Sequence, residues 1–359
     1  MKKVLLLFII AIFCLNCKKK PIFKGEAIEY TEDLTGSGFK SSQLDELTYT
    51  LDKDYNTTSM MILYNGKSIY EYGDTKAISY MASCRKSICS MLYGKYIDNG
   101  TIDLNETIGD LGIDEADGLL PIEKQATVRD VLMAKSGVFY EPANGGYDSK
   151  NAKPRGSVEP GDYFLYNNWD FNVAGHILEL KSGNDIYQEI EDQLARPLGF
   201  QDWNIKNQSK SSTKKGKSQY PAYHIYISTR DMAKIGQLML NKGVWKGQQL
   251  ISNSWIDEST AIHTPSDTLL ARYNNPDDQQ FAYGYYWWLF ANNDYSDLDG
   301  AYQADGYGGQ YITIIPKREL VVVHKVKFPL LVSAGIKKGG SADVSGRQYN
   351  DLIHNLMKY

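Results

Sequence analysis

A β-rich pattern marks the first third of the chain. Two runs rich in apolar and aromatic residues, 59–64 and 67–72, flank the turn dipeptide Asn65-Gly66. Asn-Gly between two such runs favours a tight turn, so the pattern predicts an antiparallel hairpin. Residues 29–53 mix Gly, Ser, Thr and acidic residues with scattered apolar ones, which indicates a surface helix and a loop.

Helical spacing of apolar residues dominates the middle third. After Ser83, apolar residues recur every three or four positions until Asn99-Gly100 provides a stop signal. These positions are Ile88, Met91, Leu92, Tyr96 and Ile97. The same spacing predicts a helix over 127–133, closed by Ser136-Gly137, and another over 168–180.

The last third changes from helical to strand-like patterns. A helix is predicted after Thr229-Arg230-Asp231, with Met232, Ile235, Leu238 and Met239 on its apolar face. Three aromatic or β-branched runs then predict strands, at 283–290, 311–315 and 320–324. The last two runs are separated by 316–319 and suggest a second hairpin. Residues 206–218, rich in Lys and Ser, predict a solvated loop.

The length and composition allow a large core. The chain has 359 residues, of which 42% are hydrophobic and 12% aromatic, so about two structural units are expected, and they can share one core. The net charge is −4. Loss of Lys2 and Lys3 with a cleaved leader would leave 37 basic and 43 acidic residues, a net charge of −6. Nothing in this balance suggests a nucleic-acid partner.

The N-terminus has the pattern of a targeting segment. Lys2 and Lys3 precede an apolar run over 4–15, which is shorter than the ~20 residues of a membrane span. Residues 1–17 are therefore interpreted as a signal peptide and excluded from the fold. The protein is expected to be exported to the cell envelope, at the periplasmic or outer-membrane face.

Cys17 is the expected site of lipidation. The sequence Cys14-Leu15-Asn16-Cys17, followed by three lysines, resembles an imperfect lipobox in which Asn16 replaces the usual small residue. Cys17 would then be the lipidated first residue of a bacterial lipoprotein anchored to a membrane. An ordinary cleaved signal peptide and a retained anchor are the alternatives.

The cysteines and histidines predict neither a disulfide nor a metal site. Cys84 and Cys89 lie five positions apart on one predicted helix, so their side chains point in different directions. Outside the expected leader there is no CxxC and no HExxH, and the histidines are scattered singly at 176, 224, 263, 324 and 354. No metal and no organic cofactor are expected.

Ser83-Cys84-Arg85-Lys86 suggests a serine nucleophile with its own base. A hydroxyl needs a partner within hydrogen-bond reach to take its proton near neutral pH. Residues three apart share a helix face, so Lys86 would lie beside the hydroxyl of Ser83. A lysine kept neutral by desolvation or by cationic neighbours can accept that proton. At a helix N-terminus, backbone N–H groups would also favour an oxyanion.

The four-residue pattern alone is weak evidence. Ser-x-x-Lys recurs at Ser37, Ser211 and Ser212, although none of these matches has an apolar helical continuation. An isolated Ser83 could be a helix cap and Lys86 a solvated side chain. Downstream, Tyr166-Asn167-Asn168 could supply catalytic side chains, or Tyr166 could be a core aromatic and Asn168 a helix cap.

Four segments together resemble the penicillin-binding and serine β-lactamase superfamily, specifically its class C-like branch. The segments are Ser83-x-x-Lys86, Tyr166-x-Asn168, 127–137 and the Gly306–Gln310 turn. This branch contains lactamases, DD-peptidases, family VIII-type esterases and 6-aminohexanoate-dimer hydrolases. The resemblance covers most of the mature chain.

The resemblance implies an α/β (α+β) fold, in which an antiparallel sheet flanked by helices lies beside a mostly helical domain. The catalytic domain would cover 18–359. Its sheet subdomain would comprise about 25–80 and 220–359, and its helical subdomain about 81–219. The active site would lie between the two.

The resemblance also implies catalytic roles. Ser83 would be the nucleophile that forms an acyl-enzyme, and Lys86 the adjacent base. Tyr166 would shuttle protons and activate water, while Asn168 would orient the lysine and the substrate amide. A phenol of pKa about 10 needs a nearby cation to act as a base near pH 7, and Lys86 would provide one.

The oxyanion hole would use the backbone N–H groups of Ser83 and Tyr307. Relatives carry Lys-Thr-Gly at the second position, where it binds the substrate carboxylate, and this chain has no Lys-Thr-Gly. Asp305, Gly306 and Gly308 are the expected substrate contacts there. An acidic residue should repel a carboxylate, which favours neutral ester or amide substrates over penicillins.

The sequence therefore predicts an exported serine hydrolase that acts on a small-molecule or short-peptide ester or amide. A DD-peptidase or weak β-lactamase is the alternative enzyme. A non-catalytic envelope lipoprotein that binds peptidoglycan fragments or peptides is the alternative from another class. Tyr223 and His224 are interpreted as structural, and Trp287 and Trp288 as core or cleft wall.

Overall fold

A central antiparallel sheet organises the chain. The computed structural model describes residues 25–146, 148–212, 217–273, 281–291, 294–327 and 343–359, so the expected leader and Cys17 lie outside it. The sheet strands are β1 (Ser59–Tyr64), β2 (Lys67–Gly73), β9 (Phe281–Tyr283), β10 (Trp288–Phe290), β11 (Tyr302–Gly306), β12 (Gln310–Ile315) and β13 (Leu320–Lys325). Their order across the sheet is β2-β1-β13-β12-β11-β10-β9, with antiparallel pairing throughout.

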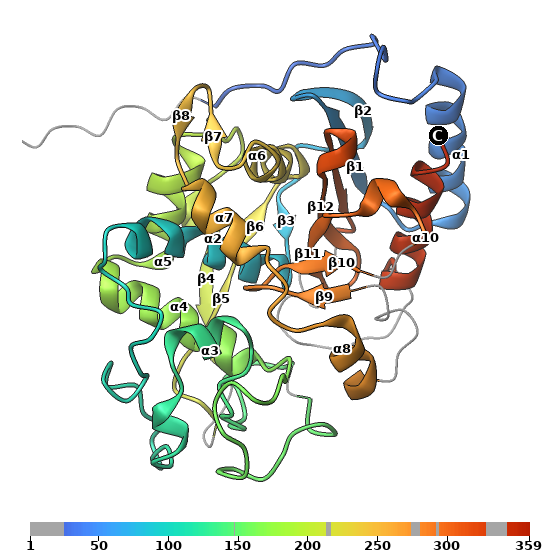
Figure 1. The fold of residues 1–359 in the computed structure, drawn as a ribbon. Helices are drawn as coiled ribbons and strands as arrows, with labels where there is room; N and C mark the ends of the chain where they lie inside the picture. Colours follow the sequence, from blue (N-terminus) through green and yellow to red (C-terminus); the bar gives the residue numbers. More distant parts are fainter. Residues whose placement is uncertain (1–24, 147, 213–216, 274–280, 292–293, 328–342) are drawn as a thin grey trace, which may run out of the picture.

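Each face of the sheet packs against its own helices (Figure 1). On β1, Met60 and Ile62 join a core with α1 (Ser41–Asp54) and α10 (Gly346–Leu356), because alternate side chains point to opposite faces. Met61 and Leu63 point the other way, into the main core with α6 (Thr229–Leu240). The sheet is therefore covered on both sides.

Five further helices lie on the α6 side of the sheet (Figure 1). They are α2 (Cys84–Asp98), α3 (Val128–Leu132), α4 (Asn168–Ser182), α5 (Ile186–Ile190) and α7 (Asn253–Ser259). α8 (Ser266–Tyr273) lies next to the edge strand β9. Three small two-stranded sheets join β3 (Ser79–Tyr80) to β6 (Tyr226–Ile227), β4 (Ser209–Ser211) to β5 (Ala222–His224), and β7 (Val244–Trp245) to β8 (Gln248–Gln249). The mixed fold with an antiparallel sheet is the predicted one. The proposed division into two subdomains remains a prediction.

Most of the predicted elements are confirmed. The hairpin about Asn65-Gly66 forms β1 and β2, and the helix after Ser83 ends before Asn99. The helix predicted at 127–133 is α3, capped by the side chain of Thr127. The helix predicted at 168–180 is α4, and its N-cap is Asn167 rather than Asn168.

The prediction of one strand over 283–290 was wrong. The run divides into β9 and β10, joined by a turn in which the N–H of Gly284 donates to the carbonyl of Trp287. Tyr286 adopts a left-handed φ of 66°. The aromatic residues of this turn are almost completely buried, so their enrichment reflects core packing rather than an extended backbone.

The prediction of a loop over 206–218 was wrong at Ser209–Ser211. These residues form β4, with Ser209 paired to His224 and Ser211 to Ala222. Because β4 is an outer, largely exposed strand, it lacks the apolar alternation that marks buried strands. Residues 213–216 lie outside the described part of the chain.

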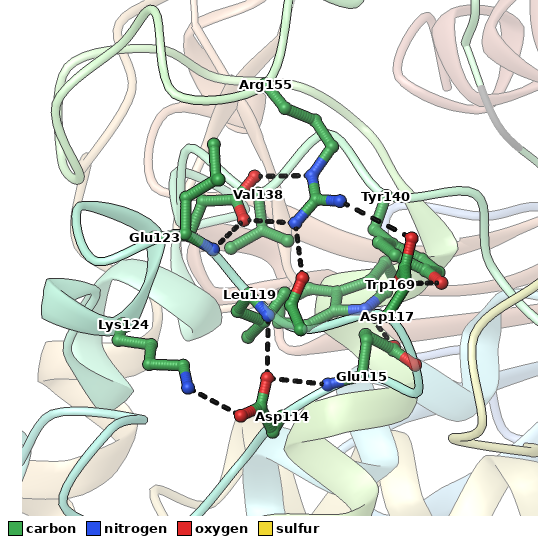
Figure 2. Close-up of polar contacts among 12 residues, drawn as sticks. Asp114, Glu115, Asp117, Leu119, Glu123, Lys124, Val138, Tyr140, Arg155 and Trp169 are labelled. Carbon is green, nitrogen blue, oxygen red and sulfur yellow. Dashed lines mark hydrogen bonds and ion pairs between the residues drawn. The ribbon is translucent and has the colours of Figure 1, made fainter.

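Buried ion pairs and hydrogen bonds hold the loops before α4 (Figure 2). The carboxylate of Glu123, 1% exposed, accepts from Nε and Nη2 of Arg155 at 3.0 and 2.6 Å. Buried Glu115 accepts from Nε1 of Trp169 at 2.7 Å and from Oγ of Ser218 at 2.5 Å. Trp169 lies in the first turn of α4, so this network fixes the end of α4 that carries Asn168.

Candidate active site

A sharp turn places Ser83 at the N-terminus of α2. Ala82 has a left-handed φ of 49°, and Ser83 follows as the N-cap residue with φ −73°. Left-handed backbone at a residue with a Cβ is uncommon and is concentrated at functional sites. The turn is held by a hydrogen bond from the N–H of Met81 to the carbonyl of Ile225 at 3.0 Å. Ser83 therefore lies where the helix dipole favours negative charge.

The side chain of Lys86 lies against the hydroxyl of Ser83. The distance from Nζ of Lys86 to Oγ of Ser83 is 3.0 Å, which is within hydrogen-bond reach. Lys86 is 2% exposed, whereas Ser83 is partly exposed. The geometry expected from the three-residue spacing on a helix is thus present, with the hydroxyl open to a reactant and the amine shielded from water.

Two aromatic rings enclose the amine of Lys86. Its Nζ lies 3.9 Å from the ring centroid of Tyr166 and 3.9 Å from that of Phe171, in the first turn of α4. The two rings are 4.8 Å apart. Each contact would stabilise an ammonium by about 0.5–2 kcal/mol. The rings therefore hold the amine in place and also favour its charged form.

Burial opposes this effect. Burial lowers the pKa of Lys86 well below its usual range, the neighbouring Arg85 guanidinium lowers it further, and Asp305 acts in the opposite sense. Complete burial shifts a lysine pKa by up to about 3–5 units, more than the two rings would restore. Lys86 is therefore disposed to be a neutral amine, which is the form that can accept a proton from Ser83.

Tyr166 completes the group around Ser83. Its phenol forms a hydrogen bond with the hydroxyl of Ser83, and its ring packs 5.6 Å from Trp288 and 6.3 Å from Tyr283. Burial raises the pKa of Tyr166, an effect that the bond to Ser83 only partly offsets. The phenol is thus held in its protonated form, and the electrostatics favour Lys86 over Tyr166 as the resting base.

Asn168 is the first residue of α4, two positions after Tyr166. Its Nδ2 donates to the carbonyl of Gly145, and its backbone N–H donates to the carbonyl of Gly146 at 3.2 Å. Its Oδ1 is buried and has no hydrogen-bond partner among the described residues. None of the contacts described for this part of the chain joins Asn168 to Ser83 or Lys86.

The β11–β12 turn approaches the N-terminus of α2. A Cβ on Gly306 would lie 2.6 Å from the carbonyl oxygen of Met81 and 3.1 Å from Sγ of Cys84, so only glycine fits there. Gly308 continues the turn with a φ of 79°. The adjoining Tyr307 is 67% exposed. The structure thus brings the predicted oxyanion segment next to the residues that flank Ser83.

Asp305 lies on the opposite face of the sheet from Gly306. It pairs across the strands with Tyr311, whose ring stacks 3.8 Å from that of Tyr349 in α10. Side chains alternate along a strand, so Asp305 faces α10 while Gly306 faces α2. Asp305 nevertheless interacts electrostatically with Lys86 and Tyr166. Its charge favours the ammonium of Lys86 and raises the pKa of Tyr166.

Sequence reasoning missed Phe171 as part of the site. Its apolar character marked only a buried helix position, and nothing in the sequence indicates that its ring covers a lysine. It also missed Ala82, whose left-handed backbone carries no residue signal. Trp287 is fully buried, and Trp288 packs against Tyr166, so the second tryptophan borders the site.

Other features of the described chain lie away from Ser83. One hollow lies between α1 and α10, and a second between 26–29 and α6. In the described ranges, no cluster of His, Cys, Asp or Glu could hold a metal ion, and no helix is long and apolar enough to cross a membrane. Cys84 and Cys89 are both buried and free.

Two solved structures and one sequence relative are similar to most of this chain. A candidate 6-aminohexanoate-dimer hydrolase of Bacillus anthracis has a TM-score of 0.60 at 21% identity, covering 88% of this chain and 82% of its own. A candidate β-lactamase of Bacteroides dorei has a TM-score of 0.63 at 14% identity, covering 89% and 100%. An uncharacterized protein of Alkalihalophilus pseudofirmus is 23% identical over 315 residues, or 80% of this chain and 82% of its own. At these identities the structural likenesses show the fold.

The fold is that of the penicillin-binding and serine β-lactamase superfamily, whose members include serine hydrolases. The β-lactamase family model matches residues 44–325, well over half of the chain. The chain therefore belongs to the β-lactamase family.

Proposed function

We propose that the chain is an exported serine hydrolase that cleaves an ester or amide through an acyl-enzyme on Ser83. The observation that carries this proposal is the 3.0 Å distance between Nζ of Lys86 and Oγ of Ser83, together with the burial of Lys86. Burial favours the neutral, proton-accepting form of an amine, and the hydroxyl of Ser83 is within hydrogen-bond reach of this amine.

The proposed acylation step moves one proton through this group. Neutral Lys86 accepts the proton of Ser83 while Oγ attacks the substrate carbonyl carbon. The tetrahedral oxyanion is stabilised by the helix N-terminus and by the backbone N–H groups of Ser83 and Tyr307. The bond to the leaving group breaks as Tyr166 donates its phenolic proton to that group, and Lys86 returns a proton to Tyr166.

Deacylation uses the same residues in reverse. Water attacks the acyl carbonyl and loses a proton to neutral Lys86. The second tetrahedral intermediate then expels Oγ of Ser83, which takes that proton back from Lys86. The acid product leaves, and Lys86 is again neutral. Asn168 is proposed to meet the substrate amide, because its buried Oδ1 has no partner in the described part of the chain.

The preferred substrate is proposed to be uncharged near the scissile bond. Lys-Thr-Gly, which binds a carboxylate in relatives, is absent, and the field of Asp305 reaches the site. The likeness to a candidate 6-aminohexanoate-dimer hydrolase supports an amide as one substrate class. Family membership favours a DD-peptidase or weak β-lactamase as the second candidate.

Steady-state assays separate these functions. The ester or amide hydrolase should turn over p-nitrophenyl esters and be acylated poorly by a fluorescent penicillin. The second candidate instead predicts stable penicillin labelling. A folded protein that binds peptides or peptidoglycan fragments without turnover, with the same affinity after Ser83→Ala, would replace both with a binding function.

Export and anchoring are a separate part of the proposal. They rest on the apolar run over 4–15 and on Cys17 followed by three lysines. Metabolic labelling with a fatty-acid probe should mark the full chain in a bacterial host and leave Cys17→Ala unlabelled. Equal labelling of both would rule out Cys17 as the anchor.

A further inference from the structure

Arg85, the residue before Lys86, is a buried cation without an acidic partner. It is 2% exposed, and its Nη1 has no hydrogen-bond partner among the described residues. Nη2 donates to Oδ1 of Asn172 at 3.4 Å, and the guanidinium lies 4.6 Å from the ring centroid of Tyr223. No carboxylate of the described chain forms an ion pair with it. Burying a charge in this way costs several kcal/mol, so a compensating function is expected.

The adjacent basic residues Arg85 and Lys86 of α2 each contact a residue of α4. Phe171 covers the amine of Lys86, and Asn172 accepts from Arg85. The side chains therefore point to different sides of α2, and Arg85 is kept out of contact with Ser83. Both side chains are nevertheless buried, each 2% exposed. Because a guanidinium is not deprotonated in proteins, it is the amine of Lys86 that loses its proton when two charges are unfavourable.

We propose that Arg85 is a positioning residue that acts through Lys86: its buried, unpaired charge keeps the lysine in its neutral, proton-accepting form. This proposal rests on the proposed serine hydrolase function, and it assigns to Arg85 the control of the protonation state of Lys86. The charge acts against the two aromatic rings around Lys86 and against Asp305, all of which favour the ammonium. Without Arg85, burial alone would have to overcome these three opposing effects.

The groups that face Arg85 are neutral in the relevant pH range. Burial raises the pKa values of Tyr80, Tyr187 and Tyr223, and of Cys89 on the same helix. Burial and Arg85 lower the pKa of His224 to about 4. Tyr166 is likewise held protonated by burial, and the acids that act on this region are Asp305 from β11, Glu179 from α4 and Asp185 at the N-cap of α5. Lys325, whose pKa burial lowers to about 7, is another buried lysine that can titrate in this range. A titration seen between pH 5 and 9 is therefore assigned to Lys86 only if it is lost in Lys86→Met and retained in Lys325→Met.

The test compares Arg85→Met, which removes the charge, with Arg85→Lys, which keeps it. The rate of Ser83 acylation by a fluorophosphonate is measured from pH 5 to 9.5. In Arg85→Met the rise of the rate with pH should move upward by about 1–3 units, as expected for removal of a like charge. At pH 9.5 the rate should approach that of the unmodified chain. Arg85→Lys should keep most of the original profile.

A merely structural role gives a different pattern. Arg85→Met would then be slower by the same factor at every pH, and Arg85→Lys would not rescue the profile; this result would overturn the proposal. Arg85→Gln, which is also neutral but retains hydrogen-bonding groups, replaces Arg85→Met if that variant does not fold.

A second readout does not depend on catalysis. NMR of lysine labelled with ¹³C at Cε reports the titration of Lys86 directly, and Lys86→Met assigns its signal. The titration should move upward in the Arg85→Met or Arg85→Gln chain, and an unchanged midpoint would overturn the proposal. If the unmodified chain forms no Ser83 adduct, the proposed function fails, whereas the NMR result still decides the effect of Arg85 on Lys86.

Discussion

The amine of Lys86 lies 3.0 Å from the hydroxyl of Ser83, and the lysine is buried while the serine is partly exposed. The difference in exposure sets the direction of proton transfer. The partly exposed hydroxyl of Ser83 can meet a substrate, whereas the buried amine of Lys86 can hold a proton only at an energetic cost. Ser83 is therefore the proposed nucleophile and Lys86 the proposed base.

Lys86→Met should abolish most of the acylation of Ser83. The apolar side chain fills the space between Tyr166 and Phe171 without accepting a proton, so the rate should fall by about 10²–10⁴-fold, the usual contribution of a general base. Stopped-flow acylation by a p-nitrophenyl ester measures this effect. Lys95→Met, an exposed lysine on the same helix, is the matched control and should retain the original rate. A rate in Lys86→Met within threefold of the control would refute the role of Lys86.

Tyr166→Phe should slow turnover with little change in folding. The substitution retains the ring over Lys86 but removes the hydroxyl that bonds to Ser83, so kcat should fall by about 10²-fold or more. Circular dichroism and thermal unfolding establish that the fold is intact. Tyr30→Phe, at a tyrosine that is 54% exposed, serves as the control. Equal kcat values in the two variants would mean that the phenol transfers no proton.

Lys325 should make the stability depend on pH. Burial lowers its pKa from an ordinary 10.5 to about 7, although its Nζ donates to the carbonyls of Ser79 and Ile227. Between pH 7 and 10 the unfolded chain binds a proton that folded Lys325 does not, so this residue makes the free energy of unfolding rise with pH. Below pH 7 both states are protonated, and the destabilising effect is complete.

Lys325→Met should therefore reduce the slope of stability against pH by up to about 1.4 kcal/mol per pH unit. Urea unfolding at pH 7.5, 8.5 and 9.5 measures this slope. Lys67→Met, an exposed lysine of β2, should leave the slope unchanged. An identical slope in Lys325→Met would show that the folded lysine is protonated throughout this range.

Arg155 should contribute strongly to stability, and Lys124 weakly. Arg155→Met leaves the carboxylate of Glu123 buried with only the N–H of Leu120 as a described donor, and should cost about 3 kcal/mol. The pair of Lys124 with Asp114 is partly exposed, so Lys124→Met should cost less than about 1 kcal/mol. Both pairs lie in the same network (Figure 2). Urea unfolding of both variants tests the contrast, and equal losses would contradict it.

Local periodicity predicted the serine–lysine contact correctly. Residues three apart on a helix must share a face, so the position of Lys86 beside Ser83 follows once α2 is recognised. The stop at Asn99-Gly100 and the turn at Asn65-Gly66 are equally local. These elements could be predicted because their determinants lie within a few residues.

The surroundings of Lys86 could not be predicted in this way. Phe171 covers the amine, and Asn172 holds Arg85, only because α4 packs against α2, a contact between residues about 85 positions apart in the sequence. The orientation of Asp305 depends on the register of β11 with β12, which the Gly306–Gln310 turn alone does not define. The burial of Arg85 and Lys86 likewise depends on how the whole core packs.

Every proposed step depends on an acyl-enzyme at Ser83. Its formation can be measured by intact-protein mass spectrometry of the chain without residues 1–17, exposed to a fluorophosphonate, a p-nitrophenyl ester and a penicillin. We expect one fluorophosphonate adduct, mapped to Ser83 and absent from Ser83→Ala, with transient ester labelling and little penicillin labelling. A folded chain that forms no adduct, or forms it equally after Ser83→Ala, would rule out Ser83 as the nucleophile.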